Sequence, residues 1–527
     1  MKIKKDNNKF IKGALILMLF GFLSKIVGAV YRIPLTSIIG AEGMGLYQMV
    51  FPLYTLMLTI SSSGLPSSIS KLVSENIAKN NYKQADKIIK MSFILLVCFS
   101  VLCCFIVLLF SSTFSKIQGN KDAMLCYIGI APAIVFVGLI SGFRGYFQGL
   151  QQMVPSAVSG FIEQVVKMVL GLKLSAVFMK KGLTYGVFGA MLGISVSEVI
   201  ACLYLFISYL ISRKTFKFNI MKNNGELLGN KKTAYKILSL SIFITLGGLI
   251  MPLSMLIDSV VVINILQNIG FSKGLSTTLF GLQTGTVGSI INMPVVLSLG
   301  LSTAILPCVS SSCAKEDFVG VKQSASKALL LTLIIALPAS VGVCVFSEVI
   351  LKILYGASLG VFEIKIASKV LEVASFGIFY LAMVQVSSGI LQGISKFYVP
   401  LISLTFGAIV KIVLNLILIR IEAVNIIGAE FSSVVCYMVA LGINLVVLKK
   451  YNVVKLDYKI FVILILSGLI FFSKKLFDMF LKINLNYYLS FFVTVFLVVL
   501  FYLIIIAVLY RNLIKINKNN KKKSCFK

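Results

Sequence analysis

Six lysine and arginine residues stand inside long apolar segments of the 527-residue chain, where a charged side chain is costly. A cation at the centre of a membrane helix costs about 2.5–3.5 kcal/mol, so such residues usually face a partner or a water-filled cavity. Lys25 and Arg32 are two helical turns apart and therefore share one face of a helix. For Arg144 and Lys173, snorkelling to the interface is the alternative. The six residues are Lys25, Arg32, Arg144, Lys167, Lys173 and Lys411.

These cations indicate the kind of ligand that a cavity between the helices would take. Several Lys and Arg side chains together suit a phosphate or a diphosphate, whereas a carrier of cationic drugs would need an excess of carboxylates. We therefore predict a cavity that binds a diphosphate through Lys25, Arg32, Arg144, Lys167 and Lys411.

Five acidic residues stand in or near the same apolar segments. Glu163 precedes Lys167 by four residues, a spacing at which the two could neutralise each other on one helix. Glu372 and Glu430 are close to the ends of their segments, where we expect the membrane interface. Glu198 and Asp258 are deeper, and each could hold a coupling proton or sodium ion or serve as a structural partner for a cation.

The sequence contains no constellation that indicates catalysis. It has no His, no paired carboxylates in a loop and no phosphate-cradling loop, so we predict no catalytic residues, no metal site and no cofactor. A membrane-embedded transferase would need acids or bases in its loops, and the loops supply mainly isolated lysines. A transporter is therefore favoured over an enzyme.

The elements that must position the charges are membrane helices. Hydrophobic residues make up 58% of the chain and charged residues 13%, which excludes a soluble enzyme. Apolar runs long enough to cross about 30 Å of hydrocarbon predict an all-α integral membrane protein with about 14 transmembrane helices. The expected spans are 13–39, 46–66, 90–112, 123–149, 154–179, 185–211, 236–265, 278–307, 328–347, 366–393, 398–420, 426–448, 459–476 and 487–511.

The net charge of +32 is explained by membrane topology. Lys and Arg are concentrated in the two tails and in alternate loops, which predicts that both termini are cytoplasmic. The protein is therefore expected to be a multi-pass protein of the cytoplasmic membrane, and nucleic acid is not an expected partner. The basic tails, 1–12 and 512–527, are expected to lie against anionic lipids.

An internal repeat divides the chain. Residues 145–168 match residues 389–412 at an offset of 244, with Gln148 aligned to Gln392 and Lys167 to Lys411. This period corresponds to six helices and is typical of carriers in which two bundles rock about a site at their interface. The predicted units are an N-terminal lobe (13–211), a cytoplasmic linker (212–235), a C-terminal lobe (236–448) and an appended helix pair (459–511).

Helix-breaking residues occur near the predicted cavity. Pro34 and the glycines of 40–45 follow Arg32, and the eighth span carries Gly281, Gly285, Gly288 and Pro294. They could form hinges, or they could allow close helix packing.

Three motifs resemble one known family. They are GAEGMGLYQ at 40–48, SGLP followed by ISKLV at 63–73, and FRGYFQG at 143–149. The chain is similar over its whole length to the stage V sporulation protein B family. This family belongs to the polysaccharide-exporter branch of the multidrug/oligosaccharidyl-lipid/polysaccharide (MOP) superfamily.

This resemblance implies a flippase of lipid-linked oligosaccharide, similar to lipid II flippases and involved in spore cortex peptidoglycan formation. In such flippases, cations on the first helix engage the diphosphate, and Lys25 and Arg32 occupy comparable places here. The pair of helices over 461–510 resembles the groove that holds the polyprenyl tail. The implied partners are the lipid-linked oligosaccharide, anionic lipids and a coupling ion, H⁺ or Na⁺.

Three alternatives remain open at this point. A cation-coupled multidrug antiporter of the same superfamily is disfavoured by the basic residues. A membrane glycosyltransferase acting on polyprenyl carriers and a non-transporting scaffold for wall-synthesis enzymes come from other functional classes.

Overall fold

The computed structural model describes residues 2–221, 227–453, 459–482 and 486–524, and in these residues every regular element is helical. Helices satisfy all their backbone hydrogen bonds internally, as a lipid environment requires. Eleven helical runs are long and apolar enough to cross a membrane, which confirms an all-α membrane protein. The count of 14 spans stays a prediction. Among the described residues, Leu19–Ile77 counts as one run although two spans were predicted there. The helices Met153–Met179 and Lys459–Leu469 are not among the eleven.

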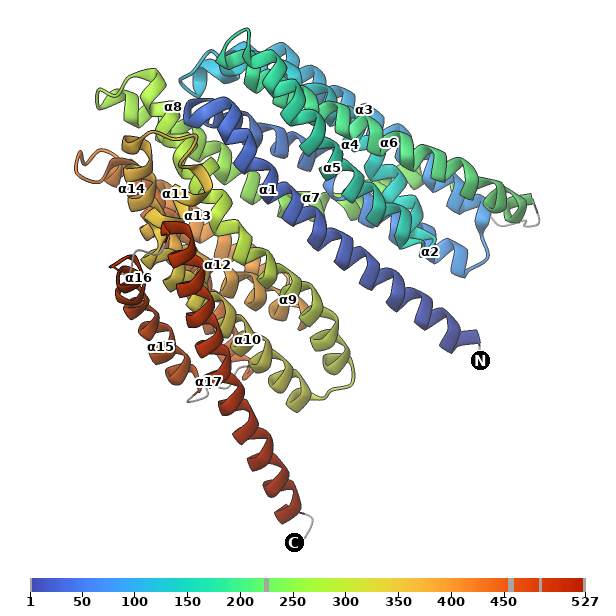
Figure 1. The fold of residues 1–527 in the computed structure, drawn as a ribbon. Helices are drawn as coiled ribbons and strands as arrows, with labels where there is room; N and C mark the ends of the chain where they lie inside the picture. Colours follow the sequence, from blue (N-terminus) through green and yellow to red (C-terminus); the bar gives the residue numbers. More distant parts are fainter. Residues whose placement is uncertain (1, 222–226, 454–458, 483–485, 525–527) are drawn as a thin grey trace.

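The first part of the chain forms one helical bundle, here called the first bundle (Figure 1). Its longest helix bends at Gly40, whose φ of 67° lies in the left-handed region that glycine tolerates. This bend turns the chain back, so that α1 supplies two antiparallel segments. The elements are α1 (Lys2–Leu58), η1 (Thr59–Ser63), α2 (Leu65–Ala78), α3 (Tyr82–Ile117), α4 (Ala123–Gly149), α5 (Met153–Met179) and α6 (Leu183–Met221).

The following helices form the second bundle. Side-chain caps start two of them, because Ser272 accepts a hydrogen bond from the Leu275 amide and Asp317 from the Gly320 amide. The elements are α7 (Asn230–Asn268), α8 (Lys273–Gly281), η2 (Leu282–Val287), α9 (Gly288–Ala314), α10 (Phe318–Val345), α11 (Ser347–Tyr355), α12 (Val361–Gly393), α13 (Tyr398–Leu418) and α14 (Asn425–Lys450).

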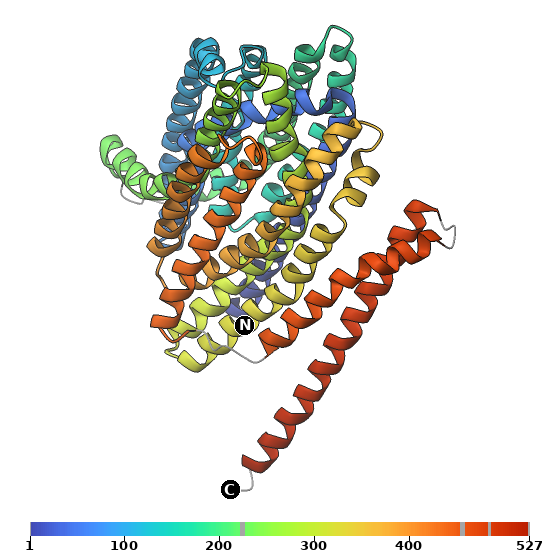
Figure 2. The ribbon, with the colours of Figure 1, turned by 90° about the vertical axis from the view of Figure 1, so that its left-hand side faces the viewer.

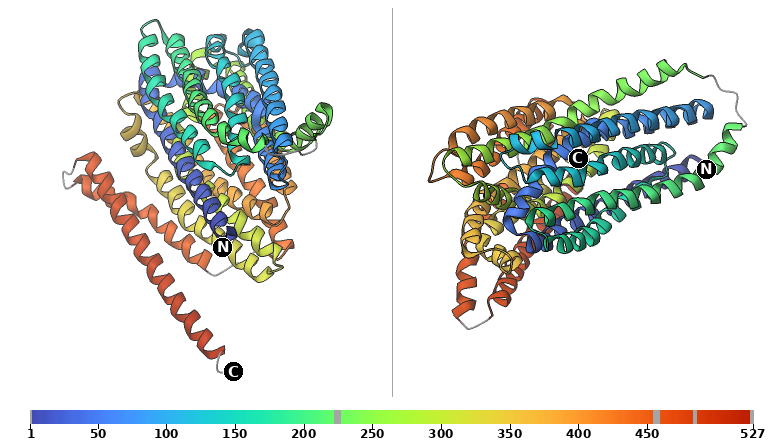
Figure 3. Two further views of the ribbon diagram at one scale, coloured as in Figure 1. Left: turned by 90° about the vertical axis from the view of Figure 1, so that its right-hand side faces the viewer. Right: turned by 90° about the horizontal axis from the view of Figure 1, so that it is seen from above.

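The last helices form a hairpin on the outside of the second bundle (Figures 2 and 3). They contact α10, where the Tyr502 hydroxyl donates to the Ile334 carbonyl at 3.0 Å. The basic tail of 512–527 continues α17 as far as Ser524, and its side chains lie outside the described part. The elements are α15 (Lys459–Leu469), η3 (Ile470–Phe472), α16 (Ser473–Lys482) and α17 (Tyr487–Ser524).

Both termini lie at one end of the molecule, here called the termini end, and the opposite end is called the far end. In Figure 1 the two bundles meet at the far end, where α1 packs against α8, and diverge toward the termini end. Neutral hydrogen bonds join them at the far end: the Gln118 amide donates to the Ser259 hydroxyl at 2.8 Å, and the Asn120 amide to Thr277 at 2.9 Å.

Two bundles with matching contacts support the predicted repeat. Gly149 on α4 approaches Val73 on α2 so closely that an added Cβ would lie 2.9 Å from the Val73 Cβ. Gly393 on α12 approaches Val309 on α9 with the same separation. Because Gly149 and Gly393 are equivalent in the repeat, the same helix pair is packed in the same way in each bundle.

The helix-breaking residues of the eighth span produce a local change of helix type. The π-helix η2 interrupts the run from α8 to α9, and a second π-helix, η1, separates α1 from α2. Such segments are frequent at functional sites. Close packing, the other alternative for these glycines, is also present, because a Cβ on Gly281 or Gly285 would overlap with Ala41 or Met44 of α1.

Close contact at the far end depends on Gly45. A Cβ atom there would overlap with the carbonyl oxygen of Thr277 on α8. We predict that Gly45→Val separates the two helices and slows the cross-linking of a Ser37→Cys/Ser358→Cys pair, whose hydroxyls lie 2.7 Å apart across the same end. Gly21→Val is the matched control, because a Cβ on Gly21 meets nothing within 4 Å. Equal cross-linking rates in the two variants would contradict the prediction.

Candidate functional site

A cavity of about 390 Å³ lies where the two bundles meet. α1 contributes one wall, and α7, η2, α9, α12, α13 and α14 contribute the others. Its lining contains two cations, two carboxylates and several neutral polar groups. The charged and amide-bearing side chains that line it are Arg32, Gln48, Asp258, Gln283, Asn292, Lys411, Asn415 and Glu430.

An ion pair joins two walls of this cavity. The Lys411 ammonium on α13 forms a short contact with one carboxylate oxygen of Asp258 on α7, and the Asn415 amide donates to the other at 3.0 Å. The side chains of Lys411 and Asp258 are only 14% and 12% exposed. Both oxygens of Asp258 are therefore occupied, and the charge of Lys411 is already compensated.

Sequence reasoning did not assign the four amide side chains to the cavity, namely Gln48, Gln283, Asn292 and Asn415. The Gln283 amide on η2 donates to Glu430 at 3.1 Å, and the Gln48 amide donates to the Thr284 carbonyl at 3.1 Å. Glu430 was expected at the membrane interface, and the structure places its side chain in the lining of the cavity. The glycines of the eighth span drew attention to this segment but did not identify Gln283.

Arg144 is paired within the first bundle. Its guanidinium lies 3.2 Å from a carboxylate oxygen of Glu163 on α5 and donates to the Ser159 hydroxyl at 3.2 Å. The predicted neutralisation of Glu163 by Lys167 is therefore wrong. The Gln164 amide donates to the other oxygen of Glu163 at 2.8 Å, so this carboxylate is fully engaged without Lys167.

The remaining predicted cations have no such partner. Among the described residues, no carboxylate lies within 4.0 Å of Lys25, Arg32 or Lys167. The Arg32 guanidinium makes only a long contact of 3.5 Å to the Ser289 hydroxyl. The Lys167 ammonium lies 5.8 Å from the centre of the ring of Tyr31, the residue that precedes Arg32 in the chain. We call Lys25, Arg32 and Lys167 the unpaired cations.

These three residues extend from the cavity toward the termini end. Arg32 lines the cavity, and Lys25 stands two turns nearer to the termini end of α1, where its side chain is exposed. α5 packs along α1, and Lys167 interacts electrostatically with Glu163 and Glu198, and more weakly with Arg32 and Lys25. Of the three residues, Arg32 alone lines the cavity, and Lys25 marks the exposed outer end of the row.

Glu198 on α6 is a different kind of acidic residue. Its side chain is 5% exposed, and among the described residues it makes no hydrogen bond or ion pair. The charges near it are those of Glu163, Arg144 and Lys167. Glu198 thus belongs to the charge cluster of the first bundle, whereas Asp258 belongs to the central cavity.

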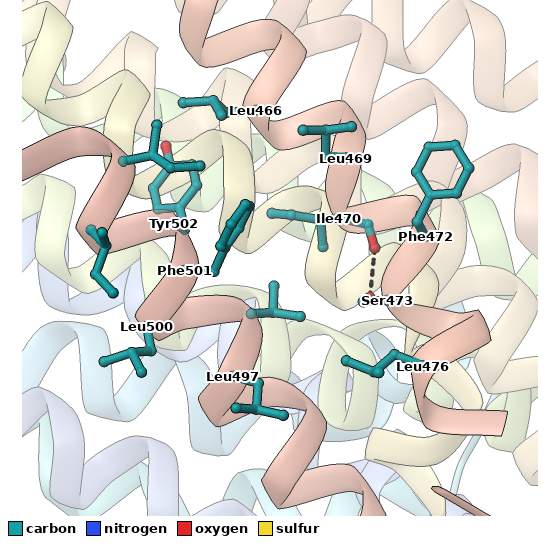
Figure 4. Close-up of a pocket in the computed structure, with 13 residues that line it drawn as sticks. Leu466, Leu469, Ile470, Phe472, Ser473, Leu476, Leu497, Leu500, Phe501 and Tyr502 are labelled. Atoms are coloured by element: carbon teal, nitrogen blue, oxygen red, sulfur yellow. Dashed lines mark hydrogen bonds between the residues drawn. The ribbon is translucent and has the colours of Figure 1, made fainter. Parts of the chain in front are cut away.

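A separate apolar groove of about 490 Å³ lies between the last helices (Figure 4). α15, η3 and α16 form one side and α17 the other, with Leu469, Leu497 and Phe501 among the lining residues. Two lining residues carry a hydroxyl group, and both hydroxyls are satisfied, because Ser473 donates to the Ile470 carbonyl at 2.5 Å and Tyr502 to the Ile334 carbonyl at 3.0 Å. The groove can thus hold a hydrocarbon chain without burying an unsatisfied polar group.

Comparison with known proteins agrees with this arrangement. The family "Polysaccharide biosynthesis protein" matches residues 10–270, and the family "MatE" matches residues 283–417. Stage V sporulation protein B of Bacillus subtilis is 29% identical over 427 residues, which cover 81% of this chain and 80% of that protein. The chain thus carries a polysaccharide biosynthesis protein domain followed by a MatE domain. The resemblance seen in the three motifs is therefore confirmed.

Two further comparisons extend over nearly the whole chain. Lipid II flippase MurJ of Bacillus subtilis is 27% identical over 504 residues, covering 91% of this chain and 90% of that protein. A solved structure titled "Lipid II flippase MurJ, inward closed conformation" covers 95% of this chain with a TM-score of 0.72 and 17% sequence identity. The similarity of fold therefore extends beyond the two bundles into the last helices.

The ion pair of the cavity makes a testable contribution to stability. Lys411→Met leaves the Asp258 carboxylate buried without its cation, and we predict a loss of about 3–5 kcal/mol in the free energy of unfolding. Adding Asp258→Asn should recover most of the lost free energy of unfolding, because both charges are then removed. Thermal unfolding in detergent, with Lys173→Met as an exposed control on α5, measures the difference. A double variant as unstable as Lys411→Met would contradict the pairing.

Proposed function

We propose that this chain is an alternating-access flippase that carries a cell-wall precursor linked to undecaprenyl diphosphate across the cytoplasmic membrane. It is a transporter, and no covalent step is required. The observation that carries the proposal is the row of unpaired cations that leads into a polar cavity between two bundles. The similarity to proteins named for lipid II flipping and for sporulation supports a peptidoglycan precursor, with spore cortex as the expected destination.

The diphosphate is assigned to the unpaired cations. Lys25, Arg32 and Lys167 have no carboxylate partner in the described structure, so an anion with two phosphates can make charge-assisted hydrogen bonds that no protein group already makes. Arg144 and Lys411 are engaged with Glu163 and Asp258. Their contribution to the diphosphate site would require the breaking of an existing ion pair, so they rank below the other three.

The other parts of the substrate have separate places. The sugars fit the cavity, where Gln48, Asn292 and Asn415 offer neutral hydrogen-bonding groups. The polyprenyl chain is assigned to the apolar groove between α16 and α17, which can shelter hydrocarbon. This division matches the chemistry of each part to a surface of the same polarity.

The described conformation corresponds to a carrier open toward the termini end. We place this end in the cytoplasm, because the basic tails and loops are found there. The first bundle and the second bundle serve as the two lobes that rock, and the units predicted from the sequence are proposed as their boundaries. The cycle then loads substrate from the cytoplasmic leaflet and releases it after the far end opens.

The driving force is assigned to the membrane potential or to an ion at an acidic residue. Asp258 suits an ion less well than the sequence indicated, because Lys411 and Asn415 occupy both of its oxygens. Glu198 is buried, makes no hydrogen bond or ion pair within the described residues, and is the better candidate for H⁺ or Na⁺. A multidrug antiporter shares the fold but would have to bind a cationic drug beside three unpaired cations.

The unpaired cations can be tested by transport. In vesicles with labelled lipid II and a leaflet-specific probe, Lys167→Ala should lower the flipping rate about tenfold or more, because a charged hydrogen bond contributes about 1.5–3 kcal/mol. Lys25→Ala combined with Arg32→Ala should abolish flipping while leaving expression intact. Lys173→Ala removes an exposed cation from the same helix as Lys167 and should leave the rate unchanged. Normal flipping by the double variant would refute the site.

The groove can be tested by filling it. Leu497→Trp places a large ring among the lining residues, so we expect slower flipping of a substrate with a long polyprenyl chain and little change for a short-chain analogue. Val499→Trp is the control, because Val499 is 49% exposed on the same helix and does not line the groove. An equal effect of Leu497→Trp on both substrates would exclude the groove as the place of the chain.

A further inference from the structure

A second concave surface lies on the outside of the first bundle, away from the central cavity. This crevice has a volume of about 670 Å³ and is formed by α3, α4 and α6. It shares no lining residue with the central cavity or with the groove of the last helices. We call it the lateral crevice. It is lined by Lys90, Phe93, Ile94, Leu139, Phe143, Cys202, Leu203, Phe206, Tyr209 and Arg213.

The lateral crevice is polarised along the direction of the helices. Its two cations, Lys90 on α3 and Arg213 on α6, stand nearest to the termini end of their helices. From there, the lining along α3, α4 and α6 toward the far end is apolar and aromatic. The crevice therefore has a cationic head and a hydrocarbon-compatible body, in the same order as a phospholipid of the leaflet at the termini end.

The cationic head carries a net positive charge that is open to a ligand. Lys90 and Arg213 share one carboxylate, Asp86, at 2.7 and 3.6 Å. The Lys90 side chain is 60% exposed and that of Arg213 33%. One carboxylate cannot neutralise two cations. Two more lysines stand beside this cluster in the sequence, Lys87 next to Asp86 and Lys214 next to Arg213. An anionic phosphate would compensate the charge that remains.

The body of the crevice is held in shape by its own aromatic contacts. The Phe93 and Phe143 rings lie 4.9 Å apart, and the Phe143 and Tyr209 rings 5.3 Å apart. The Arg213 guanidinium lies over the Tyr209 ring at 5.2 Å, which fixes the head relative to the body. A ligand thus meets a surface that is already formed.

The crevice opens sideways, toward the space that lipid chains occupy around a membrane protein. Ile94, Leu203 and Phe206 are 58%, 54% and 45% exposed on its rim. We propose that the lateral crevice binds an anionic glycerophospholipid, with its phosphate on Lys90 and Arg213 and an acyl chain along Phe93, Phe143 and Phe206. This site is distinct from the flipping pathway, because its residues face away from the cavity that joins the two bundles.

The test measures retained lipid on the full-length protein. The chain is purified from vesicles of phosphatidylglycerol and phosphatidylcholine, and native mass spectrometry gives the ratio of the two retained lipids. We expect Lys90→Gln with Arg213→Gln to lower the retained phosphatidylglycerol about tenfold. The control Lys116→Gln with Lys181→Gln removes two exposed cations from the far end of the same bundle and should leave the ratio unchanged.

Two further variants separate a built site from general charge attraction and from misfolding. Leu203→Trp fills the crevice without altering a charge and should also lower retained phosphatidylglycerol, whereas Ile207→Trp, exposed on the same helix outside the lining, should not. Lys90→Gln alone changes an exposed side chain and should lower retained phosphatidylglycerol only in part.

Three results would overturn the proposal. They are an unchanged ratio in the Lys90 and Arg213 variant, an equal loss in the far-end control, and displacement of phosphatidylglycerol from the wild-type chain by lipid II. The last result would assign the crevice to the transported substrate. Because the readout is bound lipid, a failure of flipping activity does not affect it.

Discussion

The arrangement of the charged residues follows from one constraint: an ionised side chain that is buried away from water without a counter-charge costs free energy. In a membrane protein this cost is met either by an ion pair or by a cavity that admits water. The chain uses both solutions. Lys411 and Arg144 are compensated by Asp258 and Glu163, and these pairs tie neighbouring helices together. The unpaired cations keep their charge available, and their outermost member, Lys25, is exposed. In the proposed function, stability and ligand binding therefore depend on different members of one set of intramembrane charges.

The internal repeat makes this division visible. Lys167 and Lys411 are equivalent in the repeat and lie on equivalent helices, α5 and α13. Lys411 contacts an acid from α7, whereas Lys167 faces the ring of Tyr31. The duplicated halves have kept the lysine but differ in its partner. An anion that enters between the bundles would therefore be held mainly by the first bundle, because the second bundle presents neutral amides, the compensated pair of Lys411 with Asp258, and the Glu430 carboxylate.

The sequence predicted the helical fold well, because hydropathy reports directly which segments can lie in lipid. It also predicted the repeat, whose matching residues recur at a fixed offset, whereas the glycines of the eighth span were compatible with hinges and with close packing. Pairings between helices were harder to predict. The spacing of Glu163 and Lys167 describes one isolated helix, but Arg144 reaches Glu163 from α4, and only the packing of α4 beside α5 makes that contact. Glu430 was misplaced for a related reason, since distance from a helix end does not tell which face looks inward.

The two ends of the cavity differ in the kind of contact that must break or form during transport. At the far end the contacts of Gln118, Asn120 and Gly45 are neutral. The ion pair of Asp122 with Lys273, at 2.8 Å, also joins the bundles there, but its side chains are 53% and 46% exposed, so water can solvate both charges when the pair separates. Toward the termini end, closure would remove water from three cations that repel one another. A ligand shifts such an equilibrium only by its difference in affinity for the two states. A diphosphate would lower the cost of closure by compensating these cations. We infer that the empty carrier is held open by its own charge and that loading permits it to close.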